Sequence, residues 1–160
     1  MLDTESVKDF MLALVKSPEL QPYGGRSFCN IGARRDAQFF GCHDFDNQSL
    51  LADDMVQILK TNSKWTPTYF WEIASKWARI GGLAFAAMSS KDLGEAHGHI
   101  AGVFPAQPFL SPSVKLLVPM LANVGAKNDI MPASECFPVD KWPLIYYLWN
   151  FTPWKTWGRF

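Results

Sequence analysis

In the first eighty residues, apolar side chains recur three or four positions apart, and proline and glycine interrupt this spacing at intervals. The pattern predicts four amphipathic helices. Asp3 or Thr4 caps the first helix, and the second runs over 27–40 until Gly41 ends it. The positions expected to be buried on the first and third helices are Val7, Phe10, Met11, Leu14 and Val15, and Leu51, Met55, Ile58 and Leu59.

A fourth helix is expected after the segment TNSKWTP. Thr66 supplies its cap, Pro67 takes its first position, and Gly81 marks its end. Its inward-facing residues are expected to be Phe70, Ile73, Ala74, Trp77 and Ala78.

Beyond Gly82 the pattern changes to short apolar runs bounded by glycine, serine and proline, which is typical of strands. The runs are LAFAAM, HIAGVF, VPMLANVG and PLIYYLWNF. Because the helices come first and the strands later, we predict an α+β fold whose helices pack on one side of a short antiparallel sheet. No repeat or low-complexity segment divides residues 1–160, so we expect a single domain.

The composition supports an ordered domain, since 48% of the 160 residues are hydrophobic. The formal net charge is zero, which provides no electrostatic attraction for nucleic acid, so we exclude nucleic acid as a partner. Aromatic residues are abundant, and they either fill the core or line a groove for sugar or peptide. A Trp-rich C-terminal segment offers a surface for a protein partner; its tryptophans are Trp142, Trp149, Trp154 and Trp157.

The N-terminal twenty residues lack the basic and apolar regions of a Sec signal peptide. No apolar stretch reaches the roughly 18 to 20 residues that a membrane-spanning helix needs. We therefore expect synthesis in the cytoplasm, no membrane span, and any export by a different route.

Cys29 falls in the first turn of the second predicted helix. There the helix dipole favours a thiolate, and free backbone N–H groups can stabilise an oxyanion. Gly24 and Gly25 just upstream allow a substrate to approach closely. The alternative is that Cys29 is an inert buried side chain, as free cysteines often are. The three cysteines show no CxxC spacing, which argues against a zinc ribbon or a thioredoxin.

Two of the three histidines, His97 and His99, flank Gly98 at the start of a predicted strand. On a strand, residues two apart share a face, so His99 is a candidate general base for Cys29 and His97 a neighbour. Two solvated loop histidines are the alternative. A metal site formed by the pair is another, with further ligands from Cys42, His43, Asp44 and Asp46, but their spacing does not require it. We predict no metal and no cofactor.

A third group must hold the imidazole in its productive tautomer. Asn123 is a polar residue inside an otherwise apolar strand run, which suits this role. It is alternatively a turn asparagine before Gly125, in which case Glu95, Ser134 or Glu135 would orient the ring.

The order of these motifs resembles the small papain-like amidohydrolases and peptidases of the CHAP and NlpC type, especially single-domain members of phages and bacteria. The similarity covers residues 28–147 and rests on FCN, LADDM, Trp65, GLAFAA, HGHIAGVFP, VPMLANVG and an aromatic YY strand. It implies a papain-like core in which Cys29 is the nucleophile, His99 the general base and Asn123 the orienting group. His99 is preferred to His97 because it directly precedes the apolar alternation.

The resemblance also implies the activity, which is hydrolysis of an amide bond in peptidoglycan, within the stem peptide or between N-acetylmuramic acid and L-alanine. The protein would act in the periplasm or cell wall after phage or dedicated delivery. We expect the stem peptide to contact His97, Arg34 and Trp65, although a solvated helix face is the simpler explanation for the arginine, since exposure is the norm for this residue. The family usually has larger residues where this chain has Gly32 and Gly102, so looser packing beside the site is expected. Neither the N-terminal helix nor the C-terminal tail matches the family.

Two other functions fit the same residues. The fold is alternatively a binding or structural module, such as part of a phage tail, with Cys29 inert. The protein is otherwise a metal-dependent hydrolase that uses His97 and His99. A chelator would stop the metal enzyme, and a thiol alkylator would stop the cysteine enzyme.

Overall fold

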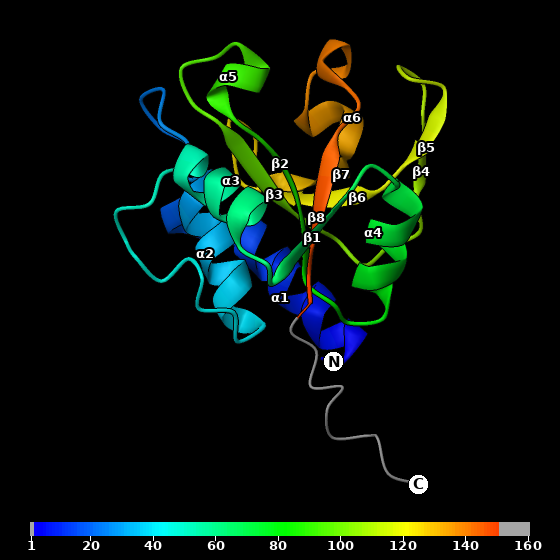
Figure 1. Ribbon diagram of the computed structural model, residues 1–160, viewed down its shortest axis with the longest axis horizontal. Coiled ribbons are helices and arrows are strands. Elements are labelled where there is room, and N and C mark those ends of the chain that lie inside the picture. The colour runs from blue at the N-terminus through cyan, green and yellow to red at the C-terminus, as the bar shows by residue number, and fades with distance from the viewer. Residues whose placement is uncertain (1, 151–160) are drawn as a thin grey trace, which may run out of the picture.

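The computed structural model describes residues 2–150 (Figure 1). Its helices are α1 (Thr4–Lys16), η1 (Pro18–Leu20), α2 (Cys29–Phe39), α3 (Ala52–Thr61), α4 (Trp71–Arg79), α5 (Ser90–Leu93), α6 (Ala133–Cys136) and η2 (Val139–Lys141). Its strands are β1 (Trp65–Thr68), β2 (Ala84–Met88), β3 (His99–Val103), β4 (Phe109–Ser111), β5 (Leu116–Val118), β6 (Met120–Asn123), β7 (Asp129–Pro132) and β8 (Ile145–Trp149).

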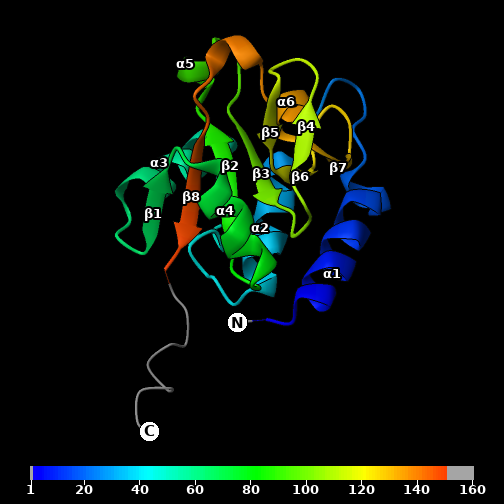
Figure 2. The ribbon, with the colours of Figure 1, turned by 90° about the vertical axis from the view of Figure 1, so that its right-hand side faces the viewer.

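Six strands form one antiparallel sheet in the order β1-β8-β2-β3-β6-β7, and β4 and β5 form a separate two-stranded ribbon. The α+β class expected from the sequence is confirmed. β2 and β3 lie at the centre, where Phe85 pairs with Gly102 and Met88 with His99. This central position brings the start of β3 to the same end of the sheet as the head of α2 (Figure 2).

Helices cover both faces of the sheet, so the expectation that all of them pack on one side is wrong (Figure 1). On one face, Phe85 and Ile100 pack with residues of α2 and α3. On the other face, Ala86 and Ala101 pack with residues of α4. The reason is visible in β2, where all five residues are buried, because a strand apolar at every position needs cover on both sides.

The segment expected to begin the fourth helix is instead an edge strand. Thr66 and Pro67 lie in β1, which pairs only with β8, and α4 begins at Trp71. An edge strand accommodates proline because one side of its backbone needs no hydrogen-bonded neighbour. With this later start, Phe70 and Ile73 are exposed, while Ala74 and Ala78 face the sheet as expected.

Packing between α2 and the sheet is close at Gly32 and Gly102, which corrects the expectation of looser packing. A Cβ on Gly32 would lie 2.8 Å from Val124 Cγ2, and a Cβ on Gly102 would collide with the Asp36 carboxyl. The two glycines therefore let the helix that carries Cys29 lie directly against β3 and the segment after β6.

Gly102→Ala is expected to lower the free energy of unfolding by about 1 to 3 kcal/mol, because the new methyl overpacks this contact. Chemical denaturation of the variant measures the loss. Asp36→Ala removes the colliding carboxyl. Adding Gly102→Ala to Asp36→Ala should therefore lower the free energy of unfolding by less than adding it to the wild type. An equal loss in both backgrounds would contradict the contact.

The C-terminal tryptophans within the described residues belong to the core. Trp149 is buried among residues of α3 and β1, and Trp142 packs partly buried against the cluster under α4. Neither forms the exposed partner surface that the sequence suggested, and Trp154 and Trp157 lie outside the described residues. Within residues 2–150, every helix is too short or too polar to cross a bilayer.

Candidate active site

Cys29 is the first residue of α2. The preceding Phe28 makes no side-chain bond to the first turn, so the leading amides of the helix are not capped by it. The thiol is 7% exposed and its sulfur lies 4.0 Å from the Gly98 carbonyl oxygen, to which it can donate. The side chain packs in the cluster that contains Ile100, on the α2 face of the sheet.

The thiol is neutral in this setting. Burial raises the pKa of Cys29, and the nearby Asp53 carboxylate raises it further, while backbone hydrogen bonds near Ile100 and Asn30 lower it. The helix dipole alone therefore does not produce a resting thiolate, contrary to the expectation from the sequence.

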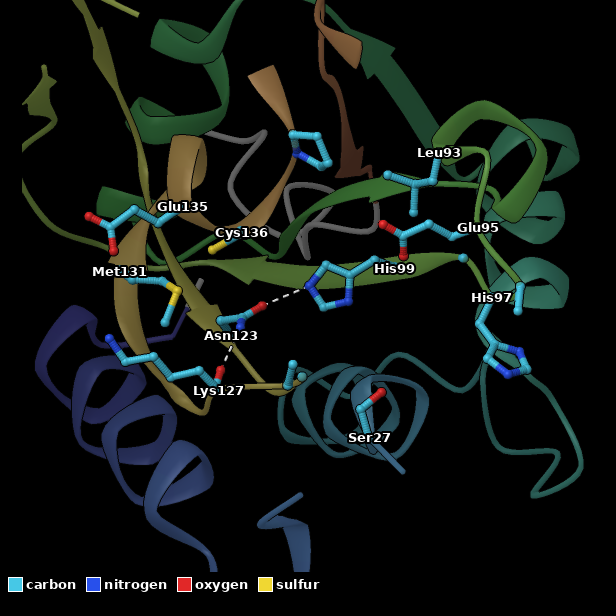
Figure 3. A pocket seen from close by; sticks show the side chains of 15 residues that line it. Ser27, Leu93, Glu95, His97, His99, Asn123, Lys127, Met131, Glu135 and Cys136 are labelled. Atoms are coloured by element: carbon cyan, nitrogen blue, oxygen red, sulfur yellow. Dashed lines mark hydrogen bonds between the residues drawn. The ribbon is translucent and has the colours of Figure 1, made fainter. Parts of the chain in front are cut away.

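His99 and Asn123 form a hydrogen-bonded pair between adjacent strands (Figure 3). His99 Nε2 lies 2.7 Å from Asn123 Oδ1, and the Asn123 amide donates to the Lys127 carbonyl at 2.6 Å. This second bond fixes which way the amide points, so Oδ1 must accept and Nε2 must carry the hydrogen. His99 Nδ1 therefore holds the lone pair, as a general base requires.

The imidazole of His99 is held by its surroundings as a neutral ring. It packs against Phe137 with ring centroids 5.0 Å apart, on the face of the sheet that α6 covers. Burial lowers the pKa of His99, while the Asn123 hydrogen bond and the Glu95 charge raise it.

Cys29 and His99 lie on either side of the β3 backbone at its start, and they form no hydrogen bond with each other in the described structure. The sulfur is directed at the carbonyl of Gly98, the residue that precedes His99. The structure thus connects the proposed base, His99, to the proposed orienting group, Asn123, by a hydrogen bond. The proposed nucleophile, Cys29, contacts the backbone of Gly98 and not the His99 side chain.

Two hollows meet at this point and share Ser27, His97 and Gly98. One, of about 350 Å³, is lined by Cys29 and the start of α3. The other, of about 390 Å³, is lined by His99 and Asn123. Together they form a groove across the start of β3, with the sulfur in one half and the imidazole in the other.

The His99 half of the groove contains ionisable side chains that the sequence did not predict to lie there. Glu95, Lys127, Glu135 and Cys136 line it, from the loops beside β3 and β6 and from α6. The sequence named Glu95 and Glu135 only as substitutes for Asn123. The β7–α6 segment that carries Glu135 and Cys136 is too short to show a helix or strand period, so it was not recognised.

His97 lines both hollows, but it precedes β3 and is exposed. Because the strand begins at His99, the two histidines do not share a strand face as expected. His97 is placed to contact a ligand in either half of the groove.

Arg34 and Trp65 do not line either hollow, which corrects their expected contact with substrate. Arg34 donates to the carbonyls of Phe45, Asn47 and Gln48 and so holds the loop after α2. Trp65 is 4% exposed, stacks on Phe45 and donates to Asp44. Both residues stabilise the loop before α3.

The alternative metal site has no ligand set among residues 2–150, where no group of three His, Cys, Asp or Glu side chains is placed to hold an ion. The segment 42–46 is used internally instead. His43 pairs with Asp46 at 2.8 Å, and Asp44 accepts from Trp65 and Lys64.

Comparison with known proteins adds no relative from which function can be transferred. A scan of the sequence against family models matches none of them, and a search of curated proteins finds no match.

Proposed function

We propose that the protein is a cysteine amide hydrolase with a papain-like core, in which Cys29 is the nucleophile, His99 the general base and Asn123 the group that orients the base. The observation that carries the proposal is the His99–Asn123 hydrogen bond, because it leaves Nδ1 as an acceptor in a groove that also contains the Cys29 sulfur.

The reaction begins from a neutral thiol and a neutral imidazole. As the sulfur attacks the substrate carbonyl, its proton passes to His99 Nδ1, and the uncapped amides at the head of α2 stabilise the oxyanion. The imidazolium then protonates the leaving amine, and an acyl-enzyme remains. Neutral His99 next takes a proton from water as the water oxygen attacks the acyl carbon. The carbon–sulfur bond then breaks, the acid leaves, and His99 returns the proton to the sulfur.

For this sequence of steps the sulfur and Nδ1 must come within hydrogen-bond reach when substrate binds. Contacts of this kind are often long before substrate is present. In the resting state the buried sulfur contacts the Gly98 carbonyl oxygen and backbone groups near Ile100 and Asn30. The Cys29 side chain must therefore leave these contacts, and the start of β3 must shift, before the sulfur can reach Nδ1.

The substrate we propose is the peptide part of bacterial peptidoglycan, and the site of action is therefore the periplasm or cell wall. The groove is open at both halves, so a stem peptide can extend across the start of β3 with its scissile carbonyl at Gly98. The amide bond lies either within the stem or cross-link or between muramic acid and L-alanine.

Digestion of purified peptidoglycan, followed by mass spectrometry of the new ends, tests this function. New amino and carboxyl ends are expected within the stem, or free muramic acid carboxyl groups at its junction with the sugar. Activity should be lost after thiol alkylation and retained with a chelator. The reverse result would contradict the cysteine mechanism, and intact peptidoglycan would contradict the substrate.

A binding or structural module is the second candidate, and the raised pKa of Cys29 favours it. Alkylation by iodoacetamide distinguishes the two candidates if it is measured with and without a stem-peptide ligand. A catalytic Cys29 should react faster at neutral pH when the groove holds a ligand, because the bound ligand brings His99 Nδ1 within hydrogen-bond reach of the sulfur. Reaction only at or above a pH of about 8.5, the pKa of an ordinary thiol, in both conditions would favour the module.

Asn123→Ala is expected to lower kcat about ten- to a hundredfold, because the imidazole loses the partner that sets its tautomer. KM should change little, since Asn123 acts on the base. Steady-state kinetics checks this split, and Asn123→Gln, which keeps an amide, is the matched variant. A change confined to KM would show that Asn123 contacts substrate instead.

A further inference from the structure

Glu95 lies at the point where the chain turns from α5 toward β3. Gly94 ends α5 in the left-handed conformation, at a φ of 73°. Its amide and that of Glu95 both donate to the Ser90 carbonyl, at 2.8 and 3.1 Å. This helix-terminating turn fixes the backbone of Glu95 before the strand begins.

The carboxylate of Glu95 faces the imidazole of His99. Figure 3 shows it immediately above the ring, on the wall of the hollow that both residues line. Glu95 forms no ion pair with any side chain of residues 2–150. Its charge is therefore not neutralised by a neighbour before it acts on His99.

The other ionisable groups around this hollow are less suited to affect the ring. Lys127 and Glu135 lie on the opposite wall, beyond Asn123, and the His97 side chain points away from the His99 ring (Figure 3). Cys136 is neutral because burial strongly raises its pKa. Cys29 packs on the other face of the sheet.

His99 lacks the negative partner that many catalytic imidazoles have. In a Ser-His-Asp triad a carboxylate stabilises the imidazolium that forms during the reaction. Here the hydrogen-bonded partner is the neutral amide of Asn123, and the ring is packed against Phe137. Burial without a nearby charge would make protonation of this ring costly.

We propose that Glu95 is a positioning residue for the general base, His99. The Glu95 carboxylate stabilises the His99 imidazolium from the side of the ring that is not bonded to Asn123. The inference depends on the proposed hydrolase function for its catalytic meaning. During the attack the Cys29 proton moves to His99 Nδ1 and the positive charge stays on the ring. Glu95 accepts no proton in this step.

The test replaces Glu95 by glutamine and follows the His99 ring signals by NMR during a pH titration of the resting protein. The His99 midpoint should move to lower pH, because the imidazolium loses its nearby negative charge. Glu135→Gln is the matched control, with the same charge change in the same hollow but on the far wall. Its His99 midpoint should stay close to that of the wild type.

In the pH–rate profile, the acid limb should move to lower pH in the same variant. The plateau kcat should fall about three- to tenfold, as expected for one charge interaction at a partly exposed site. The Glu95→Asp variant keeps the charge and should retain most of the rate. Added salt should reduce the difference between the wild type and Glu95→Gln, because Glu95 is exposed.

An unchanged His99 midpoint in Glu95→Gln would overturn the inference, even in a fully active enzyme. A fall of the same size in Glu95→Asp would also overturn it, since loss of shape would then be the cause. If the midpoint falls only in Glu95→Gln and the wild type does not hydrolyse peptidoglycan, the coupling between Glu95 and His99 stands. The proposed function, and not the coupling, would then be wrong.

Discussion

Replacing Cys29 by alanine is expected to lower the rate of peptidoglycan hydrolysis about a thousandfold or more. The loss is this large because the sulfur forms the covalent intermediate, and only the amides at the head of α2 and the binding groove remain. Cys29→Ser should be nearly as inactive, since a hydroxyl is far less acidic than a thiol and gives up its proton less readily to His99. Release of soluble fragments from purified peptidoglycan measures the loss.

Two other free cysteines provide controls for this experiment. Cys42 is buried near α2 and lines neither hollow, so Cys42→Ala should affect stability and not turnover of the folded enzyme. Cys136 lines the His99 half of the groove, and Cys136→Ala should retain most of the activity. Full activity in Cys29→Ala would contradict the assignment, and loss of activity only in Cys136→Ala would transfer the nucleophile to the other face of β3.

Most long elements could be predicted because their apolar spacing records the face that they bury. Val7, Met11 and Leu14 identify α1, and Asp3 caps it by accepting from the Ser6 amide at 3.0 Å. The missed strands β4, β5 and β7 are only three or four residues long. Such short segments become strands through pairing with neighbours and carry no period of their own.

The candidate site was predicted in sequence order but not in its full geometry. Each proposed residue lies at the end of a recognisable element: Cys29 begins α2, His99 begins β3 and Asn123 ends β6. Which face of the sheet a strand residue occupies depends on register, and a shift of one position reverses it. Here Ile100 packs with Cys29 on the side of α2, whereas His99 packs against Phe137 on the other face, and no spacing in the sequence sets that phase.

Asp36 illustrates a second feature that apolar spacing hides. It lies two turns beyond Cys29 on the same face of α2, at 1% exposure, against Gly102. Neither carboxyl oxygen has a hydrogen-bond partner among the described residues. In the sequence, Asp36 looks like an ordinary polar residue of an amphipathic helix, because nothing shows that Gly102 leaves room for its carboxyl.

Asp36 is therefore expected to contribute stability that is lost as the pH rises, against a smaller opposite contribution from His99, whose pKa is lowered by burial. Burial raises the pKa of Asp36 to about 8, above the ordinary value of 3.8 that applies in the unfolded chain. Between these two values the folded state holds a proton that the unfolded state has lost, so raising the pH favours unfolding. The slope is about 1.4 kcal/mol per pH unit for one proton, and the full change is on the order of 5 kcal/mol.

Denaturant unfolding at several pH values between 4.5 and 8 measures this dependence. The Asp36→Asn variant should lose most of the pH dependence, because the amide keeps the shape of the carboxyl group and does not ionise. Asp9→Asn is the matched control, since Asp9 is exposed on α1, and its slope should equal that of the wild type. Equal slopes in the wild type and Asp36→Asn would show that Asp36 is hydrated or paired in solution. A steeper slope in the wild type would mean that the helix carrying Cys29 is held against β3 most firmly while Asp36 is protonated.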